Sequence, residues 1–132
     1  MELILDTNFI VALEREASRQ VAGPAHAFLQ AHAADHYTLT FTVVGELACG
    51  QSASARRDWE KLCQPFPVIE WSRDIAWSYG ELFRHLQTKG QLIGTNDLWI
   101  AATALAHDLP LVTNNTTEFA RVPGLIIHPF KT

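Results

Sequence analysis

The opening of the chain decides its fold, and residues 2–13 read ELILDTNFIVAL. Residues 2–5 form a short apolar run typical of a buried strand, and this run ends at Asp6. The apolar residues that follow recur at helical spacing, at Phe9, Ile10 and Leu13. We therefore predict a strand, a tight turn and a helix, with Asp6 at the carboxyl end of the strand.

Strands and helices alternate along the rest of the chain. Short apolar runs bounded by turn residues predict further strands at residues 37–41, 68–71, 111–113 and 125–128. Helical spacing predicts helices at residues 25–34, 54–63, 72–90 and 97–107, a helix capped by Thr42, and a helical turn at 117–120. This alternation predicts an α/β fold, a three-layer sandwich in which helices flank a central, mainly parallel β-sheet.

Size and charge limit the classes of protein to consider. A length of 132 residues suits one compact domain, which we expect to span residues 1–132, and a hydrophobic content of 48% supports a packed core. The net charge of −4 argues against a protein that coats nucleic acid through Lys and Arg. It does not argue against a nuclease that holds cations with clustered carboxylates.

Cysteine usage and hydropathy predict a cytoplasmic protein. Cys49 and Cys63 form no CxxC pair, so we interpret both as free thiols. The opening residues reach an acid at once and do not resemble a signal peptide. The later apolar stretch 98–106 is shorter than the ~20 residues that a bilayer span requires, and we expect no membrane association.

Acidic residues recur where the predicted elements meet one edge of the sheet. Asp6 ends the first strand, Glu46 lies early in the helix after the second, and Asp97 begins the helix before the fourth. The polar run 113–115 follows the fourth strand at the same edge, with Glu118 just beyond it. Because ligands gather at the carboxyl ends of parallel strands, we expect a pocket with several carboxylates there.

Carboxylates gathered in this way need compensation, because two unit charges about 4 Å apart repel by ~4 kcal/mol at an effective dielectric of about 20. Either one acid stays protonated or a divalent cation lies between them. Oxygen ligands favour Mg²⁺ or Mn²⁺, and such a cation polarises a phosphoryl oxygen and activates an attacking water. The pattern indicates an enzyme that acts on phosphate esters.

Each acid also has an ordinary structural explanation. Asp6 could cap the first helix, Asp97 could complement the dipole of its helix, and Glu46 could be an exposed helical acid. These explanations must place all three at one sheet edge by coincidence, which favours a shared function.

Four stretches of the sequence resemble the PIN-domain family, and within it the VapC-type toxins. They are LDTN at 5–8, TVVGEL at 42–47 with Gly50, IGTND at 93–97 with 100–102, and LVTNN at 111–115 with Phe119 and 122–125. Each motif is short, but together they follow the family's order at typical spacing along nearly the whole chain.

The resemblance implies an endoribonuclease that depends on Mg²⁺ or Mn²⁺ and cleaves a structured RNA such as tRNA. It also implies homodimers and a small antitoxin protein that inserts near the acidic pocket. Asp6, Glu46 and Asp97 match the family's first three acids and are the expected metal ligands, directly or through water. Asn115 stands at a fourth catalytic position where many members have Asp. The expected auxiliary residues are Thr7, Asn8, Thr113 and Glu118.

Several basic residues away from the termini are candidates for contacts with RNA phosphates, although ordinary surface charge explains each equally well. They are Arg56, Arg57, Arg73, Arg84 and Lys89.

Two other functions stay open at this point. A catalytically weak PIN-like domain that only binds RNA or a partner is suggested by Asn115. A phosphatase that uses Asp6 as nucleophile is the second, although Asn8 stands where that chemistry expects a second acid.

Overall fold

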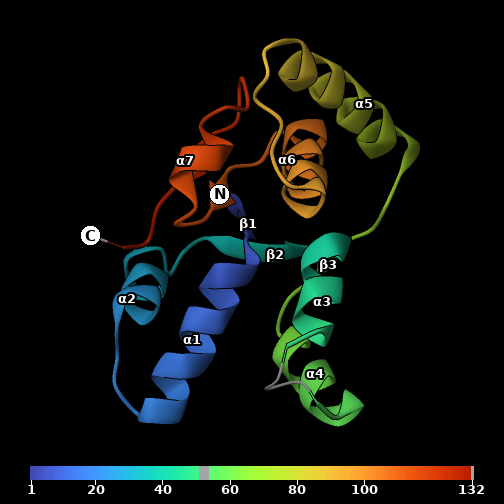
Figure 1. The fold of residues 1–132 in the computed structure, drawn as a ribbon. Helices are drawn as coiled ribbons and strands as arrows, with labels where there is room; N and C mark the ends of the chain where they lie inside the picture. The colour runs from blue at the N-terminus through green and yellow to red at the C-terminus, as the bar shows by residue number, and fades with distance from the viewer. Residues whose placement is uncertain (51–53, 132) are drawn as a thin grey trace.

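The computed structural model describes residues 1–50 and 54–131. Within these residues one sheet has five strands in the order β3-β2-β1-β4-β5, and every neighbouring pair is parallel (Figure 1). The strands are β1 (Glu2–Leu5), β2 (His36–Thr40), β3 (Val68–Ile69), β4 (Leu111–Val112) and β5 (Ile127–His128). The predicted parallel sheet is confirmed.

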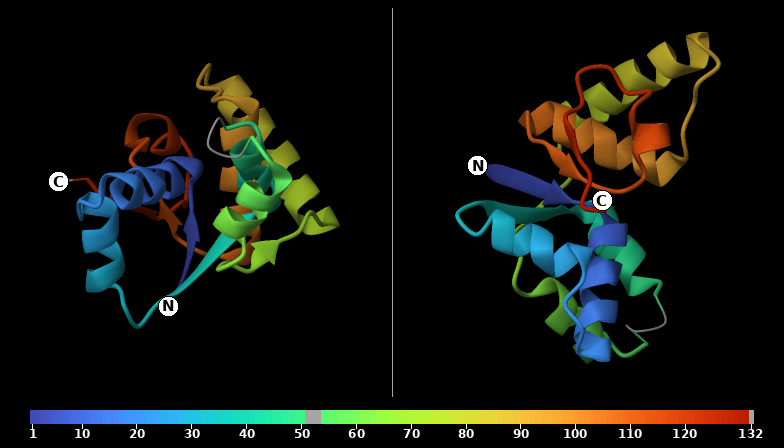
Figure 2. Two further views of the ribbon diagram at one scale, coloured as in Figure 1. Left: turned by 90° about the horizontal axis from the view of Figure 1, so that it is seen from below. Right: turned by 90° about the vertical axis from the view of Figure 1, so that its left-hand side faces the viewer.

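Helices cover both faces of the sheet, as the predicted three-layer sandwich requires. They are α1 (Thr7–Arg19), α2 (Pro24–Ala31), α3 (Phe41–Ala48), α4 (Arg56–Cys63), α5 (Arg73–Thr88), α6 (Thr95–His107) and α7 (Thr116–Phe119). Helices α1 to α4 lie on one face and α5 to α7 on the other (Figure 2). Right-handed crossovers explain this division, because the strand order runs one way from β1 to β3 and the other way from β1 to β5.

The central strand β1 lies at the middle of the core. Leu3, Ile4 and Leu5 are each 0% exposed, as expected for a parallel strand that is covered on both faces. The ring of Phe9 at the start of α1 packs edge-on against Phe28, at 5.6 Å between ring centroids, and Phe130, at 4.9 Å. These contacts tie α1 to α2 and to the chain after β5.

Some predicted boundaries were wrong. The cap of α3 is Thr40, whose hydroxyl accepts a hydrogen bond from the backbone N–H of Val43 at 3.1 Å, and not Thr42. Helix α3 therefore begins earlier than expected and Glu46 lies in its second turn. Helix α6 begins at Thr95, so Asp97 is its third residue. The remaining shifts are of a few residues at the ends of elements, as fraying ends allow.

None of the helices among residues 1–50 and 54–131 is both long and apolar enough to cross a bilayer.

Two phenylalanines at helix starts allow a matched test of the core. We expect Phe9→Ala to lower the free energy of unfolding by about 3–5 kcal/mol, because Phe9 is 0% exposed and fills the space between α1, α2 and Phe130. Phe41→Ala should cost less than about 0.5 kcal/mol, because Phe41 is 63% exposed. Urea unfolding measures both, and equal losses would contradict this view of the core.

Candidate active site

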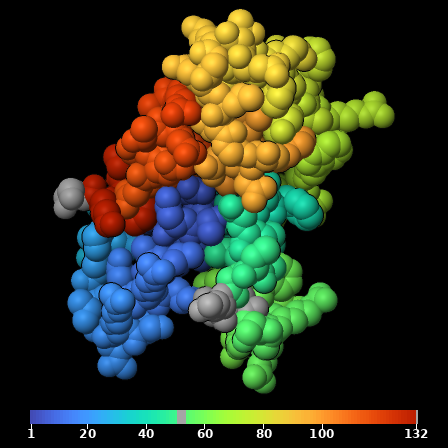
Figure 3. Space-filling model, viewed as in Figure 1, coloured from blue at the N-terminus to red at the C-terminus, as the bar shows by residue number. Residues whose placement is uncertain are grey.

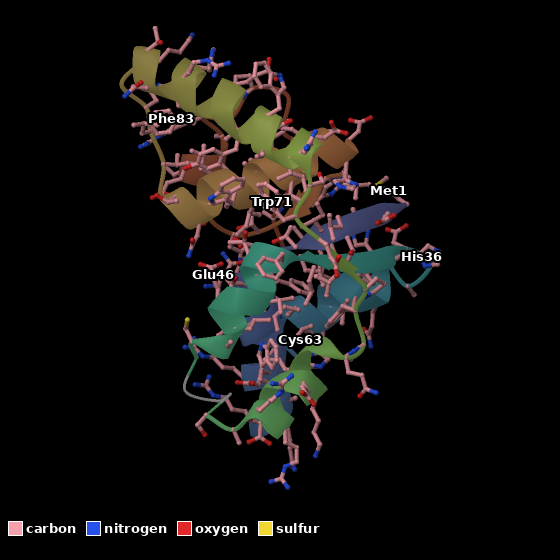
Figure 4. The ribbon with its side chains drawn as sticks, turned by 90° about the vertical axis from the view of Figure 1, so that its right-hand side faces the viewer. Met1, His36, Glu46, Cys63, Trp71 and Phe83 are labelled. Atoms are coloured by element: carbon pink, nitrogen blue, oxygen red, sulfur yellow. The ribbon has the colours of Figure 1, made fainter. Side chains whose placement is uncertain are left out.

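The predicted acids come together at the carboxyl ends of the neighbouring strands β1 and β4. From these two strands the chain crosses over towards opposite edges of the sheet. Asp6 follows β1, Glu46 lies on α3, and Asp97 lies in the first turn of α6. This is the switch in strand order at which ligands of open parallel sheets bind. In Figure 4, Glu46 lies at the end of the sheet opposite to Met1 and His36, which mark the amino ends of β1 and β2.

A cleft of about 500 Å³ opens at this edge. Asp6, Glu46, Asp97 and Asn115 all line it, together with Thr7 and Asn8. In the space-filling view the N-terminal segment, in dark blue, meets the red C-terminal segment on one side and the blue-green of α3 on the other (Figure 3). The cleft is therefore built from segments that are far apart in the sequence.

Asp6 is held rigidly at the base of the site. Its side chain is almost completely buried, and its Oδ1 accepts a hydrogen bond from the backbone N–H of Thr7 at 2.8 Å. Its Oδ2 accepts a hydrogen bond from the hydroxyl of Thr113 at 2.7 Å. Burial raises the pKa of Asp6, these two hydrogen bonds lower it in part, and the charge of Glu46 raises it again. The net effect is a raised pKa.

Thr113 is the buried centre of this network. While its hydroxyl donates to Asp6, the same oxygen accepts from Asn8 Nδ2 at 3.2 Å and from the backbone N–H of Asn115 at 3.0 Å. A hydroxyl has one proton and two lone pairs, so its capacity is fully used. Thr113 thus fixes three residues of the cleft relative to one another.

Glu46 links three helices. Its Oε1 accepts a hydrogen bond from the hydroxyl of Thr7 on α1 at 2.7 Å, and its Oε2 accepts one from Asn96 Nδ2 on α6 at 3.4 Å. These contacts aim the carboxylate of α3 into the cleft. The role of Asn96 could not be predicted from the sequence, where its position beside Asp97 is the one signal.

Asp97 has a strongly raised pKa. Burial, as the largest cause, and the negative charges of Asp6, Glu118 and Glu46 together raise its pKa to about 7. Its Oδ2 accepts a hydrogen bond from Asn115 Nδ2 at 3.4 Å. Glu118, a predicted auxiliary residue, therefore acts on Asp97 from nearby.

The site fits a hard cation that keeps part of its water shell. No three His, Cys, Asp or Glu side chains in the described part of the chain are gathered closely enough to hold an ion between them. Mg²⁺ characteristically uses one or two carboxylates and retains several waters, so closer convergence is not required. The buried amide oxygen of Asn8 has no hydrogen-bond partner among the described residues and adds a further oxygen at the cleft.

The predicted basic residues do not line the cleft. Its basic side chains are instead Arg15 on α1 and Lys131 near the C-terminus. Arg15 follows Asn8, Val11 and Ala12 at positions i+7, i+4 and i+3, a helical stripe that the sequence displays. Lys131 could not have been assigned to the site without the fold.

The raised pKa of Asp97 predicts how stability depends on pH without divalent cations. A group whose folded pKa exceeds its unfolded value destabilises the fold as pH rises from about 4 towards 7, because the unfolded chain ionises more easily. In EDTA, we expect Asp97→Asn to raise the free energy of unfolding relative to wild type, and to do so more at pH 8 than at pH 4. Asp58→Asn, at the matching third position of α4, should show no such difference.

Urea unfolding of wild type and both variants in EDTA measures this effect. An equal response of the two variants to pH would contradict the assignment of the shift to Asp97.

Known proteins of similar sequence show to which family the chain belongs. The model of the PIN domain matches residues 3–125. Ribonuclease VapC1 of Haemophilus influenzae is 32% identical over 130 residues, which cover 95% of each chain. Ribonuclease VapC2 of Rickettsia felis is 39% identical over 90 residues, 64% of this chain and 67% of the relative.

Solved structures agree. VapBC2 from Rickettsia felis, crystallised with a DNA fragment from its promoter, matches with a TM-score of 0.82 at 28% identity, over 99% of this chain and 100% of the other. VapBC-1 from nontypeable Haemophilus influenzae matches with a TM-score of 0.76 at 28% identity, over 98% of both chains. The chain therefore belongs to the PIN-domain family and, within it, to the VapC ribonucleases.

Proposed function

We propose that this protein is a divalent-metal-dependent endoribonuclease, the toxin of a toxin–antitoxin pair. The observation that carries the proposal is the cleft in which Asp6, Glu46 and Asp97 meet from three separate elements of a VapC-type fold. The pKa values of Asp6 and Asp97 are raised, so ionising these two carboxylates side by side is costly unless a cation offsets their charge.

Asp6, Asp97 and Glu46 are the proposed ligands of Mg²⁺ or Mn²⁺, directly or through water. The bound cation would polarise a phosphoryl oxygen and lower the pKa of an attacking water. Thr113 holds Asp6 in place, and Thr7 with Asn96 orients Glu46. A phosphodiester lying over these groups would be cleaved without a side-chain nucleophile.

Asn115 takes the catalytic position next to Asp97 without adding charge. Its amide donates to Asp97, whereas a fourth carboxylate there would raise the repulsion further. This supports one tightly held cation and an auxiliary, orienting role for Asn115. Glu118, which perturbs Asp97, is a second auxiliary candidate.

RNA is the proposed substrate, and a structured RNA such as tRNA is the proposed class. A small antitoxin protein is the proposed partner, since both matched structures are named VapBC, and VapBC-5 of Mycobacterium tuberculosis, which also matches, is described as a member of the VapBC family of toxin-antitoxin systems. We further expect the protein to form a homodimer and to act in the cytoplasm. We also expect Mn²⁺ to serve in place of Mg²⁺ as its cation.

The alternatives are less well supported. A phosphatase with Asp6 as nucleophile expects a second acid two residues later, where this chain has Asn8. A domain that only binds RNA or a partner is favoured by Asn115 alone.

Cleavage should depend on Asp97 and on a divalent cation. We expect Asp97→Asn to lose more activity than the roughly 10- to 100-fold typical of residues that only support metal ligands, while Asp58→Asn cleaves like wild type. Total RNA incubated with Mg²⁺, Mn²⁺ or EDTA, followed by sequencing of the new ends, measures this and maps the target. Cation-dependent cuts by Asp97→Asn at the wild-type rate would refute the assignment.

Metal binding should be visible without catalysis. Mn²⁺ at about 100 times its Kd should add about 2.7 kcal/mol to the free energy of unfolding, and EDTA should reverse this. Asp97→Asn should lose most of the gain, whereas Asp58→Asn should keep it. If Mn²⁺ stabilised the wild type and Asp97→Asn equally, the cation would bind elsewhere; stabilisation without RNA cleavage would favour the binding-only domain.

A further inference from the structure

The cleft that holds the acids has a second end of opposite charge. Arg15 and Lys131 line the same cleft as Asp6 and Asp97, and both are exposed. Neither forms an ion pair with an acid of residues 1–50 or 54–131. These two positively charged side chains face one cleft, and no acid of the described residues pairs with them. They are therefore available to an anionic ligand.

Arg15 stands at a fixed distance from the acidic end. Asn8, Val11, Ala12 and Arg15 occupy one stripe of α1 and all line the cleft. At a rise of 1.5 Å per residue, Arg15 lies about 10 Å along the helix axis from Asn8. The cleft therefore runs along α1 from the carboxylates to the cationic end.

Lys131 is fastened to the same frame. Its backbone N–H and that of Phe130 donate to Asn114 Oδ1, at 3.0 Å and 2.9 Å. Asn114 directly precedes Asn115 of the acidic cluster, and the ring of Phe130 packs on Phe9 of α1. The segment that carries Lys131 is thus held against both the loop after β4 and α1.

We propose that Arg15 and Lys131 form a phosphate subsite that binds the RNA backbone beside the phosphate at the acidic cluster. This inference rests on the proposed function and adds the path of the substrate, which follows α1. Between the two ends lie the apolar side chains of Val11, Ala12 and Phe130, a surface suited to a ribose or base. The strand is unpaired there, because a cleft of about 500 Å³ has the size of a small-molecule pocket.

Charge complementarity favours RNA over a protein as the ligand of this subsite. Once a cation occupies the acidic end, both ends of the cleft attract anions, and the repeating phosphates of one strand satisfy both. A protein would need an acidic group at one end and, without the cation, a basic group at the other.

The test compares two double variants that lower the net charge equally. Arg15→Gln with Lys131→Gln removes the subsite. Arg19→Gln with Lys61→Gln removes an exposed arginine from the same helix and an exposed lysine from α4, both outside the cleft. Urea unfolding first confirms that both fold like wild type. The probe is a short fluorescein-labelled single-stranded RNA, assayed for cleavage with Mn²⁺ and for binding by fluorescence anisotropy.

We expect the subsite variant to raise KM with little change in kcat, and to lower the slope of log affinity against log salt by about 1.4, at roughly 0.7 per phosphate contact in single strands. The ratio of its KM to that of wild type then shrinks about sevenfold between about 50 and 200 mM salt. The control variant should retain the wild-type slope.

Equal slopes for the two double variants, or a wild type that binds no single-stranded RNA, would overturn the subsite. In the first case the basic end would be left to an acidic protein partner. If the wild type binds but does not cleave, the nuclease proposal fails by itself, and the anisotropy slopes still decide the subsite.

Discussion

Burial of the Asp6 carboxylate is the constraint on which the rest of the site depends. An ionised carboxylate loses several kcal/mol of hydration when it is buried, unless hydrogen bonds replace the water. Thr7 supplies one bond from the start of α1, and Thr113 supplies the other from the end of β4. Because Thr113 reaches Asp6 only if β4 pairs with β1, the reversal of strand order is also what makes the buried acid tolerable.

The other charges are arranged around this fixed acid. Glu46 and Asp97 come from helices on opposite faces of the sheet, and the hydrogen bond from Asn96 to Glu46 joins them across the edge. The resulting field raises the pKa of Asp97 and makes the cleft a poor site for anions until a cation is bound. The basic end at Arg15 and Lys131 gives the same cleft an opposite polarity about two helical turns further along α1.

Much of the fold and of the candidate site could be predicted from local sequence, and the rest depends on tertiary contacts. The run ELILDTNFIVAL shows its change from strand to helix directly, and parallel alternation then brings Asp6, Glu46, Asp97 and Asn115 to one edge. Their catalytic roles stay predictions. The cap at Thr40 was missed because another threonine lies two residues later and the end of β2 decides between them. The position of Lys131 could not be predicted, because it depends on the hydrogen bond from its backbone N–H to the side chain of Asn114, which the folded sheet brings close.

The hydrogen bond from Thr113 to Asp6 joins residues that are 107 positions apart in the chain. A contact of such long range closes a large loop, and the loss of chain entropy on closing it slows folding. During synthesis, β1 is made before β4 and has no β4 beside it until residues 111–112 have been added. A growing chain therefore carries Asp6 without the hydroxyl of Thr113 that orients it until β4 has been made and has paired with β1.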